Sequence, residues 1–299
     1  MSHKVMDMKK AVKENVKPGD LLFIGGAQHG SPTAALAEIV RQKINHLTII
    51  SVLSSTQTLI GEGLVDKIIT GYDLLDEKRF YSLEKARATG KLPVIEESSH
   101  FGISLALYAG YMGVPFMPTL SLIGSDMMKY NKNIRSIEDP FSGRKVGVMK
   151  AVVPDIGIIH VQRVDAEGNA QKWGSLGVDI EGINASKKVI VTAEEIVDTD
   201  VIRRDPNRTI IPAFRVNAVV KQPFGAYPGH LAGCYNDAPR RPGMMGTKEA
   251  YEKNLKDSVY DVADWNEYLD NLKKENGEDY FENLRPKNLA WSDPVPSGS

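Results

Sequence analysis

Residues 25–30 are the first segment of this chain that could bind a ligand. They read Gly-Gly-Ala-Gln-His-Gly and lie between a short apolar run and a predicted helix. Backbone N–H groups at such a junction can hold an anion or a developing oxyanion, so Gly25, Gly26 and Gln28 are candidate binding residues. The segment has neither the spacing of a dinucleotide fingerprint nor the lysine of a P-loop. The alternative is a tight turn that binds nothing.

A second glycine turn, Gly124-Ser125-Asp126, follows the apolar run over residues 114–123. Such a turn can present backbone donors to a substrate carbonyl, so Gly124 and Ser125 are further candidate binding residues. The alternative is that this turn only caps a helix that starts near Met127.

The candidate catalytic residues are His100 and Glu97. They flank two serines, Ser98 and Ser99, one of which we expect to cap a helix that begins near His100. The positive end of a helix disfavours imidazolium, so we expect a neutral His100 that can act as a base or donate a hydrogen bond. The alternative is that Glu97 and the serines are caps and His100 is only a polar residue at the helix terminus.

The remaining histidines do not indicate a metal site. His29, His160 and His230 share no ligand spacing, and the sequence contains neither paired histidines nor a carboxylate–histidine helix motif. His160 lies inside an apolar run, so we expect it to be hydrogen-bonded within the core. We predict no structural metal.

Apolar strand patterns alternate with helical patterns along the chain. We expect strands over residues 21–24, 47–53, 67–70, 156–161 and 188–192, and helices over residues 6–15, from Ser31-Pro32 onward, 80–89 and 103–112. We expect Ser31 to cap the second of these helices and Pro32 to be its first residue. The strands are apolar without clean alternation, which predicts an α/β fold with a largely parallel sheet flanked by helices on both faces. Residues 103–112 are apolar nearly all round, so we expect that helix to be buried.

Residues 247–272 have a different character, with apolar side chains at helical spacing and charges between them. The apolar positions are Tyr251, Leu255, Val259, Val262, Trp265, Tyr268 and Leu272. This pattern predicts a long C-terminal helix that wraps the domain or meets a partner. There is no internal repeat or obvious linker, so we predict a single domain over residues 1–285 and a flexible tail over residues 286–299.

The composition argues against several classes of function. The 299 residues are 42% hydrophobic and 25% charged, typical of a globular protein with a sizeable core. The net charge of −1 gives no electrostatic case for binding nucleic acid or an anionic membrane. The single cysteine, Cys234, excludes an internal disulfide, and a cytoplasmic location is the simplest expectation. Residues 1–16 lack the apolar core of a signal peptide, and no stretch is apolar enough to span a bilayer.

Four segments, in this order and at these distances, resemble the α subunit of a family I CoA-transferase, with glutaconate CoA-transferase as the most similar branch. They are Phe-Ile-Gly-Gly at 23–26, Gly-Val-Pro-Phe-Met-Pro at 113–118, the stretch 154–169, and Pro-Phe-Gly-Ala-Tyr-Pro at 223–228. Glu-Glu-Ile-Val at 194–197 and Ile-Arg-Arg-Asp-Pro at 202–206 add to the likeness. The resemblance runs from about residue 5 to residue 268.

The resemblance implies an active site that is shared between two chains. In such enzymes the α and β chains have one fold, and a glutamate of the β chain attacks the acyl-CoA thioester. It implies that the partner is a homologous β subunit, that the assembly is a heterotetramer, and that the substrates are an acyl-CoA and a small carboxylate, with no permanently bound cofactor. Gly25, Gly26, Gly124 and Ser125 would then shape the acyl pocket and stabilise developing charge.

The same scaffold also carries other chemistry. Steroid-ring-opening acyl-CoA hydrolases resemble this chain, and their α chain supplies a glutamate where an ungapped count from Pro115-Phe116 places His100. A decarboxylase branch has its key change on the β chain. In either branch, His100 would move a proton. A non-enzymatic sugar-phosphate sensor of related fold would need a lysine or arginine at the glycine loop, which contains none.

Glu275-Asn276-Gly277 resembles the nucleophile motif of the catalytic β chain, where it follows an apolar strand. Here it follows Lys273-Lys274 at the end of a charged helical pattern, so we expect a solvated turn. We therefore predict that this chain carries no nucleophile of its own.

Overall fold

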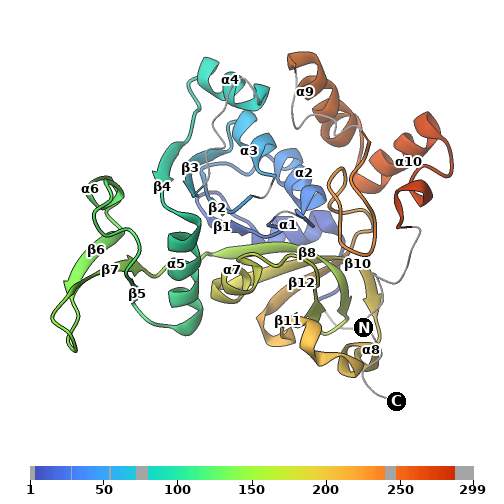
Figure 1. Cartoon of the computed structure of the whole chain (residues 1–299). Coiled ribbons are helices and arrows are strands. Elements are labelled where there is room, and N and C mark those ends of the chain that lie inside the picture. The colour runs from blue at the N-terminus through green and yellow to red at the C-terminus, as the bar shows by residue number, and fades with distance from the viewer. Residues whose placement is uncertain (1–3, 28, 54, 72–79, 240–246, 287–299) are drawn as a thin grey trace.

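The computed structural model describes residues 4–27, 29–53, 55–71, 80–239 and 247–286. A central sheet lies between two layers of helices, and an arm projects from one end of it (Figure 1). The central sheet contains β1 Leu21–Ile24, β2 Leu47–Ser51, β3 Val65–Thr70, β4 Val94–Glu97, β8 Ile156–Asp165, β9 Ala170–Gln171, β10 Lys188–Val197, β11 Thr209–Ile211 and β12 Val216–Lys221. The helices are α1 Met8–Asn15, α2 Thr33–Arg41, α3 Gln57–Gly61, α4 Tyr81–Ala88, α5 His100–Met112, α6 Met127–Tyr130, α7 Asp179–Ala185, α8 Thr199–Arg204, α9 Lys248–Leu255 and α10 Trp265–Asn276.

The prediction of a largely parallel sheet is confirmed. The strands β12, β10, β8, β1, β2, β3 and β4 pair in parallel in that order, and only β9 and β11 pair antiparallel at one side. The chain runs outward from β1 in one direction through β2 to β4 and in the other through β8 to β12. The point between β1 and β8 is therefore a topological switch point, and in open α/β sheets ligands bind outside the carboxyl ends of the strands at such a point.

Both faces of the sheet are buried, because neighbouring side chains of each strand point to opposite faces. In β1, Leu22 and Ile24 join the core beneath α1, α2, α3 and the C-terminal helices, while Phe23 joins the core beneath α5 and α7. This explains why the strands read as continuous apolar runs rather than as alternating patterns.

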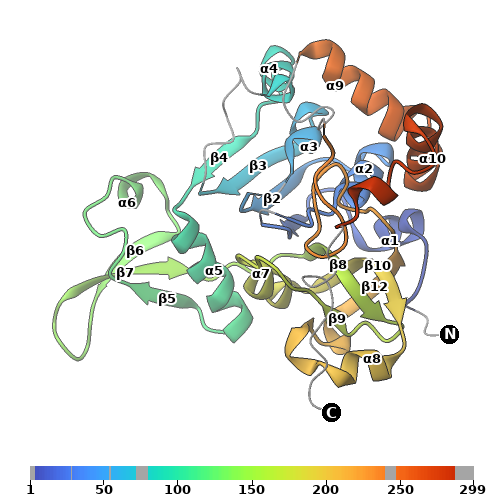
Figure 2. The same cartoon turned by 45° about the vertical axis from the view of Figure 1, so that its right-hand side comes forward.

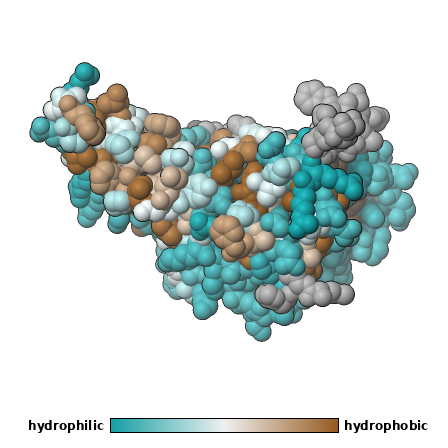
Figure 3. Space-filling view, turned by 90° about the horizontal axis from the view of Figure 1, so that it is seen from below, coloured by the Kyte–Doolittle hydropathy of each residue, from teal (hydrophilic) through white to brown (hydrophobic). Residues whose placement is uncertain are grey.

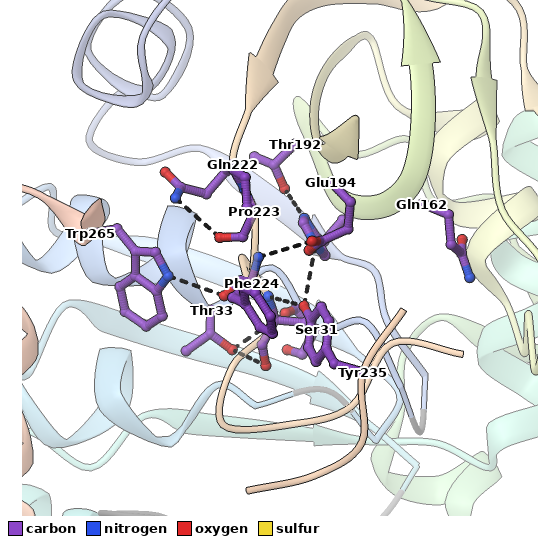
Figure 4. Close-up of polar contacts among 12 residues, drawn as sticks. Ser31, Thr33, Gln162, Thr192, Glu194, Gln222, Pro223, Phe224, Tyr235 and Trp265 are labelled. Carbon is purple, nitrogen blue, oxygen red and sulfur yellow. Dashed lines mark hydrogen bonds and ion pairs between the residues drawn. The ribbon is translucent and has the colours of Figure 1, made fainter. Parts of the chain in front are cut away.

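The segment 223–228 packs directly on the core histidine. His160 is fully buried, and its Nε2 donates to Glu194 Oε1 at 2.8 Å, as expected for a satisfied core residue. The other oxygen of Glu194 accepts from the backbone N–H of Phe224 at 3.0 Å, and Figure 4 shows Glu194, Phe224 and Tyr235 around this turn. A side chain at Gly225 would lie 2.6 Å from the His160 ring, so only glycine fits there.

Helix α2 begins at Thr33, so the expected cap at Ser31 is wrong. Pro32 occupies the cap position without a side-chain hydrogen bond, and Ser31 Oγ instead accepts from the backbone N–H of Ser55. The Ala34 N–H donates to the carbonyl of Gly225 at 2.9 Å. A loop nearly two hundred residues away in sequence thus satisfies this helix terminus, which local sequence cannot indicate.

Helix α5 begins at His100, and Ser99 caps it as expected by accepting from the Gly102 N–H at 2.9 Å. The expectation that this helix is buried is wrong for the chain by itself. One face packs on α7 and the sheet, whereas Phe101, Tyr108 and Met112 are exposed.

The arm, residues 113–150, was not foreseen from the sequence. It holds the antiparallel strands β5 Phe116–Thr119, β6 Ile134–Glu138 and β7 Lys145–Lys150 together with α6. Figures 1 and 2 both show it extending away from the central sheet beyond α5.

The C-terminal helix is present but divided. α9 continues as a π-helical turn over Lys256–Tyr260, and a new helix, α10, starts after Asp264, whose carboxylate accepts from the N–H groups of Asn266 and Glu267. The apolar positions predicted for this segment pack on the main core of the same chain. Of the two predictions for this segment, packing on its own domain is the one observed. Its apolar positions are therefore not evidence for a partner.

Trp265 tests this packing. Its side chain is buried, its Nε1 donates to the carbonyl of Phe224 at 3.1 Å, and its ring lies edge-on to Tyr268. We expect Trp265→Ala to lower the free energy of unfolding by about 3–5 kcal/mol, since a large buried ring is lost. Trp265→Phe keeps most of the buried area and should lose far less. Urea denaturation measures both, and a Trp265→Ala variant as stable as wild type would contradict the packing described.

Candidate active site

A hollow of about 370 Å³ opens outside the carboxyl ends of β1 and β2, at the side of the sheet where a ligand is expected. Four segments line it: Ala27 of the glycine loop, Val52 and Leu53 after β2, residues 100–104 of α5, and the loop that precedes α7. The lining residues are Ala27, Val52, Leu53, His100, Phe101, Ser104, Ser175, Gly177 and Val178. Among the described lining residues, most are apolar or glycine, three contribute an imidazole or a hydroxyl group, and none carries a carboxylate.

The glycine loop is held by hydrogen bonds inside the chain. The Gly25 N–H donates to the carbonyl of Ile158 at 2.9 Å, and the Gly26 N–H donates to Asp179 Oδ1 at 2.9 Å. Both amides are therefore occupied, and the expected donation from these two amides to a substrate does not fit this structure. Gly26 has φ +90°, and an added Cβ would lie 2.5 Å from the backbone of Ser31, so this turn requires glycine.

A buried ion pair helps to hold the glycine loop in place. The Nζ of Lys172 donates to Asp179 Oδ2, and both side chains are almost completely inaccessible to solvent. Asp179 thus binds the loop amide with one oxygen and the lysine with the other. Because a buried charge without a partner is costly, this pair strongly constrains where the loop lies.

His29 lies within the same loop and is buried beside two basic groups. Burial, together with the charges of Lys172 and His230, lowers the pKa of His29 to about 4. Its ring stacks on that of His230, with centroids 5.7 Å apart. His29 is therefore neutral at physiological pH and adds no positive charge to the loop.

His100 is the predicted catalytic residue that lines this hollow. It is the first residue of α5, where the helix is capped by Ser99. An added Cβ at Gly71, just after β3, would lie 2.5 Å from the His100 N–H nitrogen and 2.7 Å from its ring. The residue after β3 thus lies against His100, and the imidazole lines the hollow together with residues that follow β1 and β2.

Glu97, Ser125 and Gly124 do not join His100. Glu97 is exposed at the end of β4 and, with Ser125, lines a different hollow of about 970 Å³ that shares no lining residue with the first. Ser125 Oγ donates to the carbonyl of Leu122, and Gly124 turns the chain with φ +81°. The expected helix start at Met127 is observed, although Asp126 at its N-cap position makes no side-chain capping hydrogen bond.

Gln28 and Glu275 are the remaining residues named from the sequence. Gln28 lies outside the described residues. Glu275 is exposed in the last turn of α10, as expected for a solvated terminus. Within the described ranges, no cluster of three or more histidine, cysteine, aspartate or glutamate side chains could hold a metal ion, and no helix is long and apolar enough to cross a bilayer.

Sequence reasoning missed Ser104, Ser175 and Leu53. Ser104 follows His100 by four residues, so helical spacing could have indicated that both line one surface. The tight Gly174-Ser175-Leu176-Gly177 turn offered a weaker signal, because both of its glycines have positive φ. Leu53, with φ +60°, could not be recognised, since a leucine gives no sign of a left-handed backbone conformation.

The pH dependence of stability tests the environment of His29. Its pKa is 6.5 when unfolded and about 4 when folded, so the unfolded chain binds more protons between these values. The stabilisation from neutral His29 is therefore complete above pH 6.5 and is lost as the pH falls towards 4, by about 2 kcal/mol after allowing for solvent screening. Urea denaturation of His29→Gln should show a smaller loss over this range than wild type. Identical curves for His29→Gln and wild type would refute the assignment.

A known family model matches most of this chain. Residues 5–222 match the family model described as coenzyme A transferase. This match covers most of the chain, including the glycine loop, α5, the arm and the whole of β12.

Three relatives share about a third of their residues with this chain. An uncharacterised protein of Archaeoglobus fulgidus is 36% identical over 90% of this chain, which spans 62% of that relative's length. The A subunit of the glutaconate CoA-transferase of Acidaminococcus fermentans is 33% identical over 90% of this chain and 92% of its own length. The A subunit of the 3-oxoadipate CoA-transferase of Pseudomonas knackmussii is 34% identical over 77% of this chain and 83% of its own length.

Solved structures show the same fold. The glutaconate coenzyme A-transferase of Acidaminococcus fermentans matches with a TM-score of 0.84 and 30% identity over 98% of this chain and 99% of that chain. An acyl-CoA transferase from E. coli O157:H7 shares the fold with a TM-score of 0.58 and 18% identity, and the match covers 51% of its chain. The apolar hollow at the switch point, the sequence match and the shared fold lead to one conclusion: this chain belongs to the coenzyme A transferase family.

Proposed function

We propose that this chain is the α subunit of a heteromeric acyl-CoA:carboxylate CoA-transferase, whose β subunit supplies the nucleophilic glutamate. The observation that supports this most directly is the composition of the hollow: it can hold an acyl group, yet none of the described residues that line it carries a carboxylate. Two of the relatives are named as single subunits of CoA-transferases, which supports a second chain.

The proposed reaction proceeds by covalent catalysis. The partner's carboxylate attacks the thioester carbonyl, the C–S bond breaks, and the CoA thiolate leaves behind a mixed anhydride. The thiolate then attacks the glutamyl carbonyl of this anhydride, which releases the first acid as its carboxylate and leaves a glutamyl-CoA thioester. A second carboxylate substrate reverses these steps and leaves with CoA.

This chain would bind the acyl group and exclude water from it. In this proposal, Gly25 and Gly26 act by their shape, since their amides are occupied, and they place Ala27 in the wall of the hollow. Ser104 and Ser175 are the hydroxyl donors nearest to a bound acyl group. Ser125, which lines the second hollow, and its neighbour Gly124 remain proposed substrate contacts.

The second candidate function is an acyl-CoA hydrolase or a C–C-cleaving enzyme, with His100 as the proton-transfer residue. The position of His100 in the first hollow favours it, whereas Glu97 lies in the other hollow. A sugar-phosphate sensor is disfavoured, because the Ala34 N–H at the start of α2 is already bound to Gly225.

The site of covalent modification tests the proposed division of roles. The chain, co-purified with a β-type CoA-transferase chain from the same organism, is incubated with acyl-CoA, and the trapped protein is mapped by peptide mass spectrometry. We expect CoA on a glutamate of the partner and on none of this chain, Glu275 and Glu97 included. An adduct on any glutamate of this chain would overturn the proposal.

Substitution of His100 separates the two candidate functions. A transferase needs no general base on this chain, so His100→Ala should raise KM by a few-fold and leave kcat within about threefold. A hydrolase or C–C-cleaving enzyme should lose about a hundredfold or more in kcat, the usual scale of general acid–base catalysis. A collapse of kcat in an assembled His100→Ala complex would favour the second function.

A further inference from the structure

Exposed apolar side chains are concentrated on one part of the molecule. Fourteen of the seventeen large apolar side chains that are exposed among the described residues lie between Val94 and Val153. They are Val94, Ile95, Phe101, Tyr108, Tyr111, Met112, Val114, Phe116, Leu120, Ile123, Tyr130, Ile137, Phe141 and Val153. Figure 3 shows brown apolar surface gathered along the projecting arm, in contrast to the mostly teal body. Such a concentration marks an interaction site rather than ordinary scattered exposure.

On α5 this exposure forms a stripe. Phe101, Tyr108 and Met112 are exposed and lie on one side of the helix, with the partly buried Leu105 between them. The opposite side packs against α7 and the sheet. A helix that is apolar nearly all round is normally buried on every side. We therefore expect another chain to bury the exposed side of α5.

The arm has only a small apolar core among its described residues. The apolar cluster beneath it contains three buried residues, Ala106, Ile134 and Met149. A short three-stranded sheet needs an apolar face packed on another element to be stable. Leu120 and Phe141 instead point into solvent, with 76% and 98% of their surface exposed.

The charges of this region fit a protein partner rather than a membrane. Residues 94–153 contain six lysines and arginines and five aspartates and glutamates, so basic and acidic groups are almost balanced. Attraction to an anionic bilayer would require a basic excess. Mixed charges around an apolar centre are the usual composition of a protein interface.

We infer that the exposed side of α5 and the arm form the docking surface for the β-type subunit. This inference rests on the proposed function and specifies where the partner binds. The stripe on α5 starts at Phe101, which also lines the hollow, so a chain that covers the stripe reaches the mouth of the hollow. In the proposed function, that chain brings a carboxylate, which is absent from the described lining of the hollow. A second copy of this chain would bring the same described lining again.

The likeness to a longer enzyme supports the same occupant. The structural match covers 51% of the acyl-CoA transferase chain from E. coli O157:H7. Nearly half of that chain therefore lies outside the match. A separate β-type subunit would take the place of that additional chain here.

The test uses charge substitutions on this surface that leave the hollow untouched. Tyr108→Lys/Met112→Lys on α5 and Leu120→Lys on the arm are each co-expressed with a β-type CoA-transferase chain from the same organism. Phe214→Lys, at an equally exposed apolar residue on the body, is the matched control. Sedimentation and titration measure assembly, and thermal melting of each chain alone measures folding.

We expect the variants on this surface to weaken assembly by about a hundredfold or more, the scale of losing an interface hot spot. Their melting temperatures alone should stay within about 2 °C of wild type, because these side chains are exposed in the free chain. Phe214→Lys should assemble normally.

Three results would overturn the inference. The surface variants could bind the β-type chain as tightly as wild type. The wild-type chain alone could form a dimer that these variants dissociate, which would assign the surface to a second copy. The chain alone could bind anionic vesicles through this surface. Failure of the proposed function looks different: the wild-type complex would form, respond to the substitutions, and carry no CoA adduct on the partner.

Discussion

The buried ion pair between Lys172 and Asp179 is the interaction on which the geometry of the site most depends. One oxygen of Asp179 binds the Gly26 amide, and the other binds the lysine, so the loop after β1 is joined to the start of α7. An added Cβ at Gly177 would come within 2.5 Å of that of Ala27, which shows how closely the two loops pack. Because neither charge can be solvated, the loop has little freedom, and the wall of the hollow is preorganised.

Helix α5 connects the site to the outside of the molecule. Its first residues line the hollow, its buried side packs on α7, and its other side is an uncovered apolar stripe. In this proposal, the same helix lines the hollow and carries the docking surface. This arrangement would allow binding of a second chain to complete the hollow without any rearrangement inside the first, which is how rigid parts form a shared active site at low entropic cost.

The fold could be predicted from sequence where short-range physics determines it. Apolar runs located the buried strands, and Ser99 was identified as a possible cap because a serine before an apolar helix is a local signal. His160 was correctly placed in the core because a polar residue inside a buried strand must find partners. The start of α2 was misjudged, since its N–H partner, Gly225, comes from a distant loop. The arm was missed because its short strands expose both apolar and charged residues and show no clean period.

The candidate site was predictable only in part. The glycine loop and His100 were found by residue type, yet the use of the Gly25 and Gly26 amides depends on Ile158 and Asp179, which tertiary structure alone brings there. Glu97 was paired with His100 because they are three residues apart in sequence. The change from β4 to α5 between them directs the two side chains to separate hollows.

The central claim is that this chain forms half of an active site. A structure of the assembled complex with the β-type chain would test it most directly. The account predicts a carboxylate of the partner at the mouth of the hollow lined by Ala27 and His100, with Tyr108 and Met112 buried in the interface. A complex in which that hollow faces solvent, with no partner carboxylate near it, would contradict the claim.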